Sequence, residues 1–288
     1  MKISDFRVIP GTTVKLKEHD PAEHGDFKDK EAAKEKLEAD IGKLAELQDI
    51  FYAADSYSLL LIFQAMDAAG KDGVIKHVMS GVNPQGCQVA SFKSPSAREL
   101  DHDYLWRCNL FLPERGRIGI FNRSYYEEVL VVRVHPEYLA AQKLPEELQG
   151  GKIWKRRFRE INNFERYLTD NGTRILKFFL NLSKDEQKKR FMKRIETPAK
   201  NWKLSPSDVK ERGHWDEYME AYEDMLTETS TDWAPWHIIP ADHKWFSRVA
   251  IADTIVREMQ SLGLKYPELD EKGRAGLEEA RKMLEAEG

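Results

Sequence analysis

The sequence predicts an α/β protein built on a parallel five-stranded sheet with helices on both faces. Short, continuous apolar runs, which are typical of strands buried on both faces, alternate with segments of helical spacing. These runs lie at 58–64, 89–92, 117–121, 174–180 and 236–239. The length of 288 residues is enough for one large domain, with or without an insertion. The composition, 41% hydrophobic and 33% charged, is typical of a globular protein.

The helices between these runs can be placed from their spacing and their first residues. Between residues 30 and 53, apolar residues recur every three or four positions, which predicts one long helix. Ser96 with Glu99, and Ser183 with Glu186, have the spacing of an N-terminal capping box, so helices are expected to begin there. Two further helices are expected near 213–228 and 244–261.

The chain is predicted to have three parts. An irregular arm and the first long helix occupy residues 1–53, and the sheet-forming domain occupies 54–262. Residues 263–288 form a charged tail that is rich in Ala, Glu and Lys, which indicates a surface helix or an extended end.

Composition and charge exclude several classes of protein. The net charge of −4, from 45 Lys and Arg against 49 Asp and Glu, argues against a general nucleic-acid-binding protein but allows a local basic groove. No apolar run approaches the roughly 20 residues that span a bilayer, so no membrane association is expected. Met1–Asp5 contains no apolar export signal, and two cysteines, Cys87 and Cys108, favour a reducing compartment. A cytoplasmic protein is therefore expected.

The strongest functional signal is a phosphate-binding loop between the first strand and the helix that follows it. Small residues at Ala68, Ala69 and Gly70 allow backbone N–H groups to converge on phosphate oxygens. Lys71 can reach the outer phosphates from the N-terminus of the helix, where the helix dipole is also positive. The alternative is a Gly/Ala-rich turn without function, which the preceding buried strand makes the weaker reading.

This loop departs from the usual pattern G-x-x-x-x-G-K-[ST] at two positions. Ala65 occupies the place of the first Gly, and Asp72 occupies the place of the Ser or Thr, so it has no hydroxyl to offer to Mg²⁺. Asp67 lies inside the loop, where a carboxylate repels phosphate unless a cation lies between them. Asp67 is therefore expected to be a metal ligand.

The third strand ends in Phe-Asn-Arg-Ser at 121–124, where phosphate-loop enzymes usually carry an acid that holds Mg²⁺. Here that position is Asn122, which can ligate through its carbonyl oxygen but brings no charge. Glu127 and Glu128 follow, and either can take over part of this task. Arg123 can clamp a phosphate, and the alternative for this residue is a surface ion pair.

Two basic clusters lie further along the chain. The lysines and arginines at 152–159 can form either a solvated face or a binding surface, and the sequence does not favour one over the other. Arg190 and Arg194 lie four residues apart on one helix face, where kinases of this architecture carry a lid, although Arg190 could instead pair with Glu186. Four tryptophans are expected to pack in or over the core, with stacking of one of them on a base as the alternative: Trp202, Trp215, Trp233 and Trp236.

Four stretches of the sequence together resemble the polyphosphate kinase 2 family: 64–73, 121–134, 201–205 and 234–236. The family's loop pattern, G-x-D-x-x-G-K, is matched at Asp67, Gly70 and Lys71 and is not matched at Ala65. Its strand-end pattern, Phe-Asp-Arg-Ser, has Asn122 in place of the acid. The resemblance runs from about residue 44 to residue 259.

The Ala-Met-Asp form of the loop, together with Asn122 and the pair Tyr126-Glu127, resembles the class III branch of this family. This resemblance implies transfer of a phosphoryl group from inorganic polyphosphate to AMP and ADP, giving ADP and ATP. It also implies a P-loop kinase fold, which is a three-layer α/β/α sandwich similar to that of thymidylate kinase, with a helical lid at about 183–212. Family members assemble as homodimers or homotetramers, and Mg²⁺ is the implied cofactor, with Mn²⁺ as an alternative.

The resemblance also implies roles for single residues. Asp67 would hold Mg²⁺ and orient the accepting phosphate, Lys71 would bind the transferred group, and Arg123 would neutralise it. Glu127 would compensate for the acid missing at position 122 and favour AMP as acceptor. The expected catalytic residues are Asp67, Lys71, Arg123 and Glu127. The expected phosphate ligands are Ala68, Ala69, Gly70, Lys71, Asp72, Arg133, Arg190 and Arg194, and the expected metal ligands are Asp67 and Asn122.

Two other functions are compatible with the same residues. An ATP-dependent nucleotide kinase can share this fold, since fold alone does not set the phosphoryl donor. A non-catalytic nucleotide-binding regulator would suit the missing acid at position 122, but the presence of Asp67, Lys71 and Arg123 together argues against it.

Overall fold

A parallel sheet of five strands forms the centre of the molecule, as predicted, with the strand order β2-β3-β1-β4-β5. The computed structural model describes residues 6–287, so the first five residues, on which the absence of an export signal was inferred, lie outside it. The strands differ from their predicted bounds by at most two residues. They are β1 (Ser58–Gln64), β2 (Cys87–Ser91), β3 (Ile118–Asn122), β4 (Thr173–Asn181) and β5 (Trp236–Pro240).

The central strand β1 divides the core into two parts, because successive side chains of a strand point to opposite faces. Leu60 and Ile62 pack into one apolar cluster, whereas Leu59, Leu61 and Phe63 pack into the other. All five side chains are buried, which explains why this segment is continuously apolar rather than alternating.

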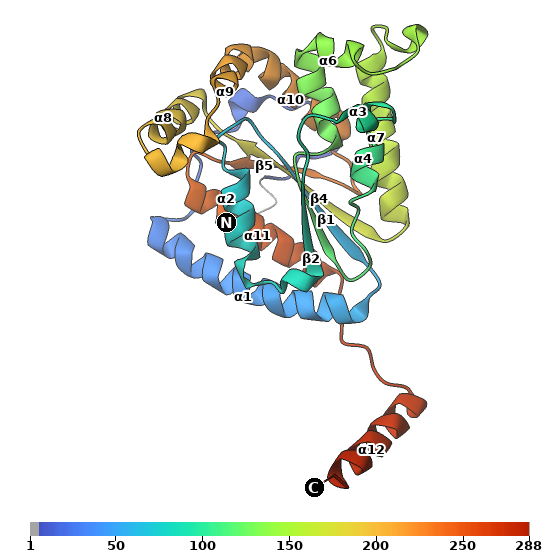
Figure 1. Cartoon of the computed structure of the whole chain (residues 1–288). Helices are drawn as coiled ribbons and strands as arrows, with labels where there is room; N and C mark the ends of the chain where they lie inside the picture. Colours follow the sequence, from blue (N-terminus) through green and yellow to red (C-terminus); the bar gives the residue numbers. More distant parts are fainter. Residues whose placement is uncertain (1–5, 288) are drawn as a thin grey trace.

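Helices cover both faces of the sheet and complete the predicted three-layer sandwich (Figure 1). One layer consists of α1 (Lys30–Ala54), α2 (Lys71–Val78) and α11 (Lys244–Ser261). The opposite layer consists mainly of α4 (Trp106–Asn109), α7 (Ile153–Asp170) and α10 (Trp215–Thr229). The remaining α-helices are α3 (Ala97–Leu100), α5 (Val131–Val134), α6 (Pro136–Ala140), α8 (Lys184–Ile195), α9 (Pro206–Glu211) and α12 (Glu271–Glu285).

Short 3₁₀ segments connect many of these elements. They are η2 (Leu16–Glu18), η3 (Met79–Gly81), η4 (Pro84–Gly86), η5 (Tyr125–Val129), η6 (Glu146–Leu148), η7 (Pro198–Lys203) and η8 (Arg212–His214). Two of them matter for function: η5 follows the end of β3, and η7 lies in the segment predicted to form the lid.

The N-terminal arm and α1 pack against the sheet domain rather than standing apart from it. The Asp29 side chain caps α1 by accepting hydrogen bonds from two backbone N–H groups. Leu44 and Phe51 of α1 are buried among side chains of the sheet and α11. In the arm, the Val8 N–H donates to the Trp236 carbonyl oxygen across 2.8 Å. Over the described residues 6–53, the N-terminal arm and α1 therefore share the core of the sheet domain.

Helix α12 extends away from this body at the end of an irregular linker (Figure 1). None of its residues is buried, which agrees with the surface helix predicted for the charged tail. Among residues 6–287, no helix is both long enough and apolar enough to cross a membrane.

We predict that deletion of residues 267–288 leaves the thermal unfolding midpoint within about 1 °C of the full chain, because α12 buries no side chain. Calorimetry of both chains measures this. Phe51→Ala is the positive control and should lower the unfolding free energy by about 4 kcal/mol, since Phe51 lies within the core. A large drop on deletion would mean that α12 packs against folded protein in solution.

Candidate active site

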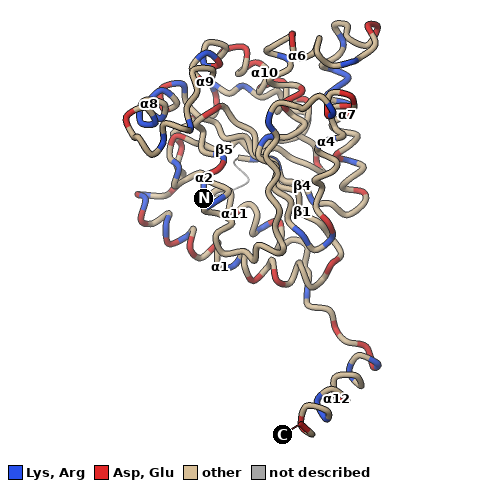
Figure 2. Tube along the Cα trace, in the orientation of Figure 1, with Lys and Arg blue, Asp and Glu red and all other residues tan. Residues whose placement is uncertain are grey.

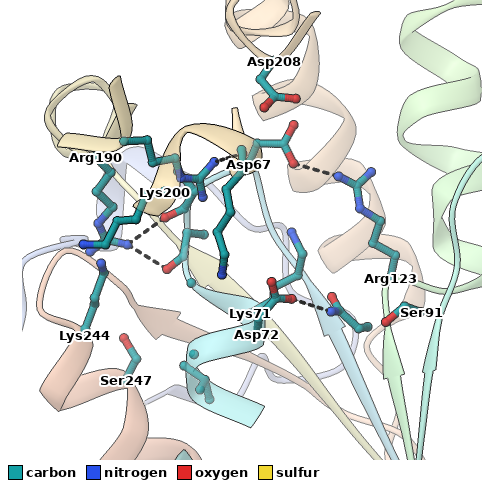
Figure 3. A pocket seen from close by; sticks show the side chains of 18 of the residues that line it. Asp67, Lys71, Asp72, Ser91, Arg123, Arg190, Lys200, Asp208, Lys244 and Ser247 are labelled. Atoms are coloured by element: carbon teal, nitrogen blue, oxygen red, sulfur yellow. Dashed lines mark hydrogen bonds and ion pairs between the residues drawn. The ribbon is translucent and has the colours of Figure 1, made fainter. Parts of the chain in front are cut away.

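A cavity of about 800 Å³ opens at the carboxyl ends of the strands, where parallel sheets place their ligands. Ten basic and three acidic side chains line it (Figure 3). The basic residues are Lys71, Lys93, Arg123, Arg190, Lys193, Arg194, Lys200, Lys203, Lys244 and Arg248, and the acidic residues are Asp67, Asp72 and Asp208. By contrast, charges of both signs are interspersed along outer helices such as α1 (Figure 2). The chain is acidic overall, but this cavity is strongly basic.

The phosphate loop forms the floor of the cavity and has an unusual backbone. Gly70, which caps α2, has φ +111°, a value that side-chain-bearing residues rarely adopt. Ala68 has φ +64° without being a glycine, so its conformation must be held by surrounding contacts. The loop residues Ala68, Ala69, Gly70, Lys71 and Asp72, which were predicted to bind phosphate, all line the cavity.

Lys71 lies at the centre of the floor. Its side chain is only 9% exposed, and Nζ donates to the carbonyl oxygen of Ala65 across 2.8 Å. Burial, together with the nearby charge of Arg123, lowers the pKa of Lys71 to about 8. The position therefore favours the arrival of an anion, because a bound phosphate would compensate the charge that burial penalises.

Arg123 connects two predicted catalytic carboxylates. Its guanidinium contacts Asp67 Oδ1 at 2.7 Å (Figure 3). It also contacts Glu127 Oε2 at 3.3 Å. Glu127 and Asp67 raise the pKa of Arg123 above its ordinary value, so the guanidinium stays charged. Arg123 also has φ +64° at the end of β3. The structure thus brings Asp67, Lys71, Arg123 and Glu127 into one neighbourhood, with Arg123 neutralised by carboxylates that a phosphate would have to replace.

The two predicted metal ligands, Asp67 and Asn122, both line the cavity. Asn122 donates through Nδ2 to Asp72 Oδ1 across 2.7 Å, and Asp67 lies nearby in the loop. Among residues 6–287, no group of three or more His, Cys, Asp or Glu side chains could hold a metal ion by itself. Mg²⁺ is usually bound by one or two protein ligands together with substrate phosphates and water. The residues present therefore fit a divalent ion that arrives with phosphate, and do not form a complete protein site.

Arg190 has a structural task that the sequence analysis did not foresee. Its guanidinium is buried and donates to the carbonyl oxygens of Ala68 and Ala69, at 3.1 and 2.7 Å, and of Ala241 and Asp242, at 2.6 and 2.9 Å. Its Nε also donates to Glu186 Oε1 at 2.9 Å, as the alternative pairing anticipated. Arg190 therefore ties α8 to the phosphate loop and to the chain after β5.

The predicted start of α8 at Ser183 is confirmed, but only half of its capping box forms. The Ser183 hydroxyl accepts a hydrogen bond from the Glu186 N–H across 3.1 Å, as expected for an N-cap. The second half of the capping box is wrong here, because the Glu186 carboxylate binds Arg190 instead. The complete box does form at α3, between Ser96 and Glu99.

The other predicted basic residues fall into two groups. Arg194 lines the cavity and donates to the carbonyl oxygen of Lys203 across 3.1 Å, within the segment predicted as a lid. Arg133 is not among the residues lining this cavity, and it pairs with Asp224 at 2.7 Å. In the 152–159 cluster, Arg157 is buried against Glu128 at 2.9 Å, so it holds α7 against η5.

Several cavity residues were missed from the sequence. Lys244, Ser247 and Arg248 lie at the start of α11, and residues 91–94 comprise the last residue of β2 and the three that follow it. Each group comes directly after a strand, so the rule that ligands bind beyond the carboxyl ends of parallel strands could have found them. The prediction that Trp202 packs on the core is wrong, since the ring is 79% exposed and lines the cavity.

We predict that Lys71→Met has a free energy of unfolding up to about 3 kcal/mol higher than that of the wild type at pH 7. The reason is that the wild type buries a protonated lysine at this position. Its folded pKa of about 8 lies below the ordinary value of 10.5, so the unfolded chain binds more protons between these values. Wild-type stability should therefore rise with pH across this window, and the difference should shrink towards pH 10.

Urea unfolding of both proteins at pH 7 and pH 10 measures this difference. Lys177, the other buried lysine with a pKa of about 8, is present in both proteins and so cancels in the comparison. A variant that is less stable than the wild type at pH 7 would contradict the burial of a charged Lys71.

Comparisons with known proteins agree with this site. The family model "Polyphosphate kinase 2 (PPK2)" matches residues 27–266. An ADP-polyphosphate phosphotransferase of Rhodopseudomonas palustris is 52% identical over 285 residues, which is 99% of both chains. An AMP/ADP-polyphosphate phosphotransferase of Meiothermus ruber is 44% identical over 264 residues, covering 91% of this chain and 95% of the relative.

A crystal structure of polyphosphate kinase 2 from Arthrobacter aurescens TC1 superposes with a TM-score of 0.86 at 39% sequence identity. The similarity covers 99% of this chain and 96% of that one, so it includes the cavity and the segment predicted as a lid. With the phosphate loop, the basic cavity and full-length relatives in agreement, the chain belongs to the polyphosphate kinase 2 family.

Proposed function

We propose that this protein transfers a phosphoryl group from inorganic polyphosphate to AMP and ADP, giving ADP and ATP. The observation that carries the proposal is the excess of ten basic over three acidic side chains around the phosphate loop. Polyphosphate carries about one negative charge per phosphate, so a linear donor needs a row of cations rather than a single phosphate pocket. The names of the two relatives, one for ADP and one for AMP and ADP, support adenine nucleotides as acceptors.

The two sides of the phosphate loop differ in chemistry, which suggests where each substrate lies. Arg190, Lys200 and Lys244 gather on one side, with Ser247 below them (Figure 3). Arg123 lies on the other side, close to Ser91 at the end of β2 (Figure 3). We assign polyphosphate to the lysine-rich side and the nucleotide phosphate to the Arg123 side, so that donor and acceptor meet over Lys71.

Phosphoryl transfer depends mainly on alignment and charge neutralisation, because the protein has little covalent chemistry to perform. Lys71 and Arg123 would neutralise the transferred group, and Arg123 would exchange its contact with Asp67 for a phosphate oxygen. Asp67 and Asn122 would hold Mg²⁺, or Mn²⁺ in its place. Bound there, the ion would supply positive charge beside the phosphate oxygens, which Asp67 and Asn122 would hold in place. A bound phosphate would give Lys71 an anionic partner, which should raise the pKa of Lys71 towards its ordinary value.

The segment at 183–212 is proposed to act as the lid over these phosphates. Lys193, Arg194, Lys200 and Lys203 from this segment all line the cavity. Arg190 anchors its first helix to the loop, so closure would move residues after Arg190 rather than all of α8. The exposed ring of Trp202 offers the lid a surface on which a nucleotide base can stack.

Location and assembly are part of the same proposal. Cys87 and Cys108 are both free thiols, which supports the cytoplasm as the compartment in which the protein acts. Assembly into homodimers or homotetramers is proposed on the resemblance to the family.

We predict that the protein, mixed with Mg²⁺, long-chain polyphosphate and AMP, forms ADP and ATP. Lys71→Ala should lower the rate about a hundredfold or more without unfolding the protein, because a preorganised charge is lost. Asp67→Asn should lose more activity than Asn122→Ala, since only Asp67 is charged. Chromatographic separation of the nucleotides measures each rate, and added chelator tests the need for a metal.

The same assay separates the competing functions. Transfer to AMP from ATP but not from polyphosphate would instead identify an ATP-dependent nucleotide kinase. Binding of nucleotide without transfer from either donor would identify a regulator.

We predict that Lys200→Ala combined with Lys244→Ala raises the KM for polyphosphate and weakens its dependence on salt, because two charges of the donor path are lost. Lys188→Ala is the matched control, since Lys188 lies on α8 but is not among the cavity-lining residues. Steady-state kinetics at two ionic strengths measures both variants. Equal effects of the two would mean that polyphosphate does not follow the lysine-rich side.

A further inference from the structure

A buried ion pair lies in the core but does not line the cavity, and the proposed mechanism does not use it. Lys177 of β4 and Glu165 of α7 are both fully buried, and Nζ lies 2.6 Å from Oε2. Neither residue is among those that line the cavity. Burying a charged lysine and a charged glutamate costs free energy, because each side chain loses its hydration on folding, so the presence of the pair has to be explained.

The two charges bind the side chains of one short element. Glu165 Oε1 accepts hydrogen bonds from the hydroxyls of Tyr125 and Tyr126, at 2.9 and 2.7 Å. Lys177 Nζ donates to the Tyr126 hydroxyl at 2.7 Å and to the carbonyl oxygen of Thr229, at the end of α10, at 2.7 Å. Both tyrosines belong to η5, so the ion pair fixes the first two residues of that segment.

The segment η5 carries part of the active site. Glu127 follows Tyr126 directly, and its carboxylate lies 3.3 Å from Arg123, which in turn contacts Asp67 at 2.7 Å. A 3₁₀ segment of five residues has few internal hydrogen bonds, so its position depends on what its side chains bind. The position of Glu127, and through it of Arg123, therefore depends on how the tyrosines are held.

Stability alone does not explain the pair. Replacing a buried ion pair by apolar side chains of similar volume is often neutral or stabilising, whereas removing one partner is costly. The pair offers hydrogen-bond directions that an apolar core cannot supply, and those directions converge on Tyr126.

We propose that Glu165 and Lys177 are positioning residues that fix η5 and thereby set the contact between Glu127 and Arg123. The kinetic part of this inference rests on the proposed transfer reaction. The structural part does not, since the placement of η5 can be measured without any substrate.

The test variant is Glu165→Gln combined with Lys177→Met, which removes both charges and keeps the volume. We expect a thermal midpoint no lower than that of the wild type, a kcat lowered about tenfold or more, and KM values within about twofold. The matched control is Asp253→Asn combined with Lys36→Met. This pair also has a buried carboxylate, at 2.6 Å from the lysine, but it joins α1 to α11 on the opposite face. The control should leave kcat unchanged.

A second measurement separates positioning from a general loss of structure. In a Glu127→Gln background, the effect of the double variant on kcat should fall to less than about twofold, because the two changes act through the same contact. A tenfold loss that persists in this background would overturn the proposal. Tyr126→Phe, which removes only the shared hydroxyl, gives a milder test if the double variant folds poorly, and it too should lower kcat.

Hydrogen exchange of the backbone amides at 125–129 provides a readout without activity. We expect exchange there to rise about tenfold or more in the double variant, and exchange in α1 and α11 to stay unchanged. Unchanged exchange at 125–129 would overturn the proposal even if the protein proved to have another activity. A wild-type protein that does not use polyphosphate would refute the proposed function but not this placement of η5.

Discussion

The active site depends on one buried guanidinium, that of Arg190. It donates to two carbonyl oxygens of the phosphate loop and to two of the chain that follows β5. Those loop carbonyls belong to residues beside Gly70, where the backbone has left-handed φ values that an isolated chain would seldom hold. An arginine suits this task because its five donors are fixed in one plane and its charge is not lost at any ordinary pH. The loop is thereby shaped before a substrate arrives, and the helix that carries Arg190 is anchored to it.

In the absence of substrate, protein oxygen atoms occupy some of the positions at which Arg123 and Lys71 would bind phosphate. Arg123 is held by the Asp67 and Glu127 carboxylates, and Lys71 donates to a backbone carbonyl oxygen. These contacts keep the groups oriented, but they are weaker partners than a multiply charged phosphate. On the proposed mechanism, substrate binding would exchange these internal contacts for stronger ones without building the site anew, which is how preorganised charge lowers a reaction barrier.

The sequence was sufficient to predict the sheet, its helices and the phosphate loop because each has a strong local signal. Continuous apolar runs marked the strands, and the loop follows the first of them directly. It was insufficient wherever a residue's partner is distant in the chain. Arg190 was expected to contact phosphates, and its carbonyl partners, about 120 and 50 positions away in the chain, were not foreseen. Nor could periodicity place Trp202, because an exposed ring at a cavity has the same local pattern as a buried one. Lys244 was overlooked although its position after β5 could have indicated it.

The two departures from the usual phosphate-loop pattern can be understood together. The usual pattern has a hydroxyl residue after the loop lysine and an acid at the end of the neighbouring strand. This chain has Asp72 at the first position and Asn122 at the second, and the two side chains are joined by a hydrogen bond of 2.7 Å. One carboxylate therefore lies at this edge of the cavity, on α2 rather than at the end of β3. The charge balance around Lys71 and Arg123 is preserved, while the amide of Asn122 keeps an oxygen ligand available where the acid usually stands. On the proposed mechanism, Asp72 would supply the negative charge that Asn122 lacks, because the two side chains are hydrogen-bonded.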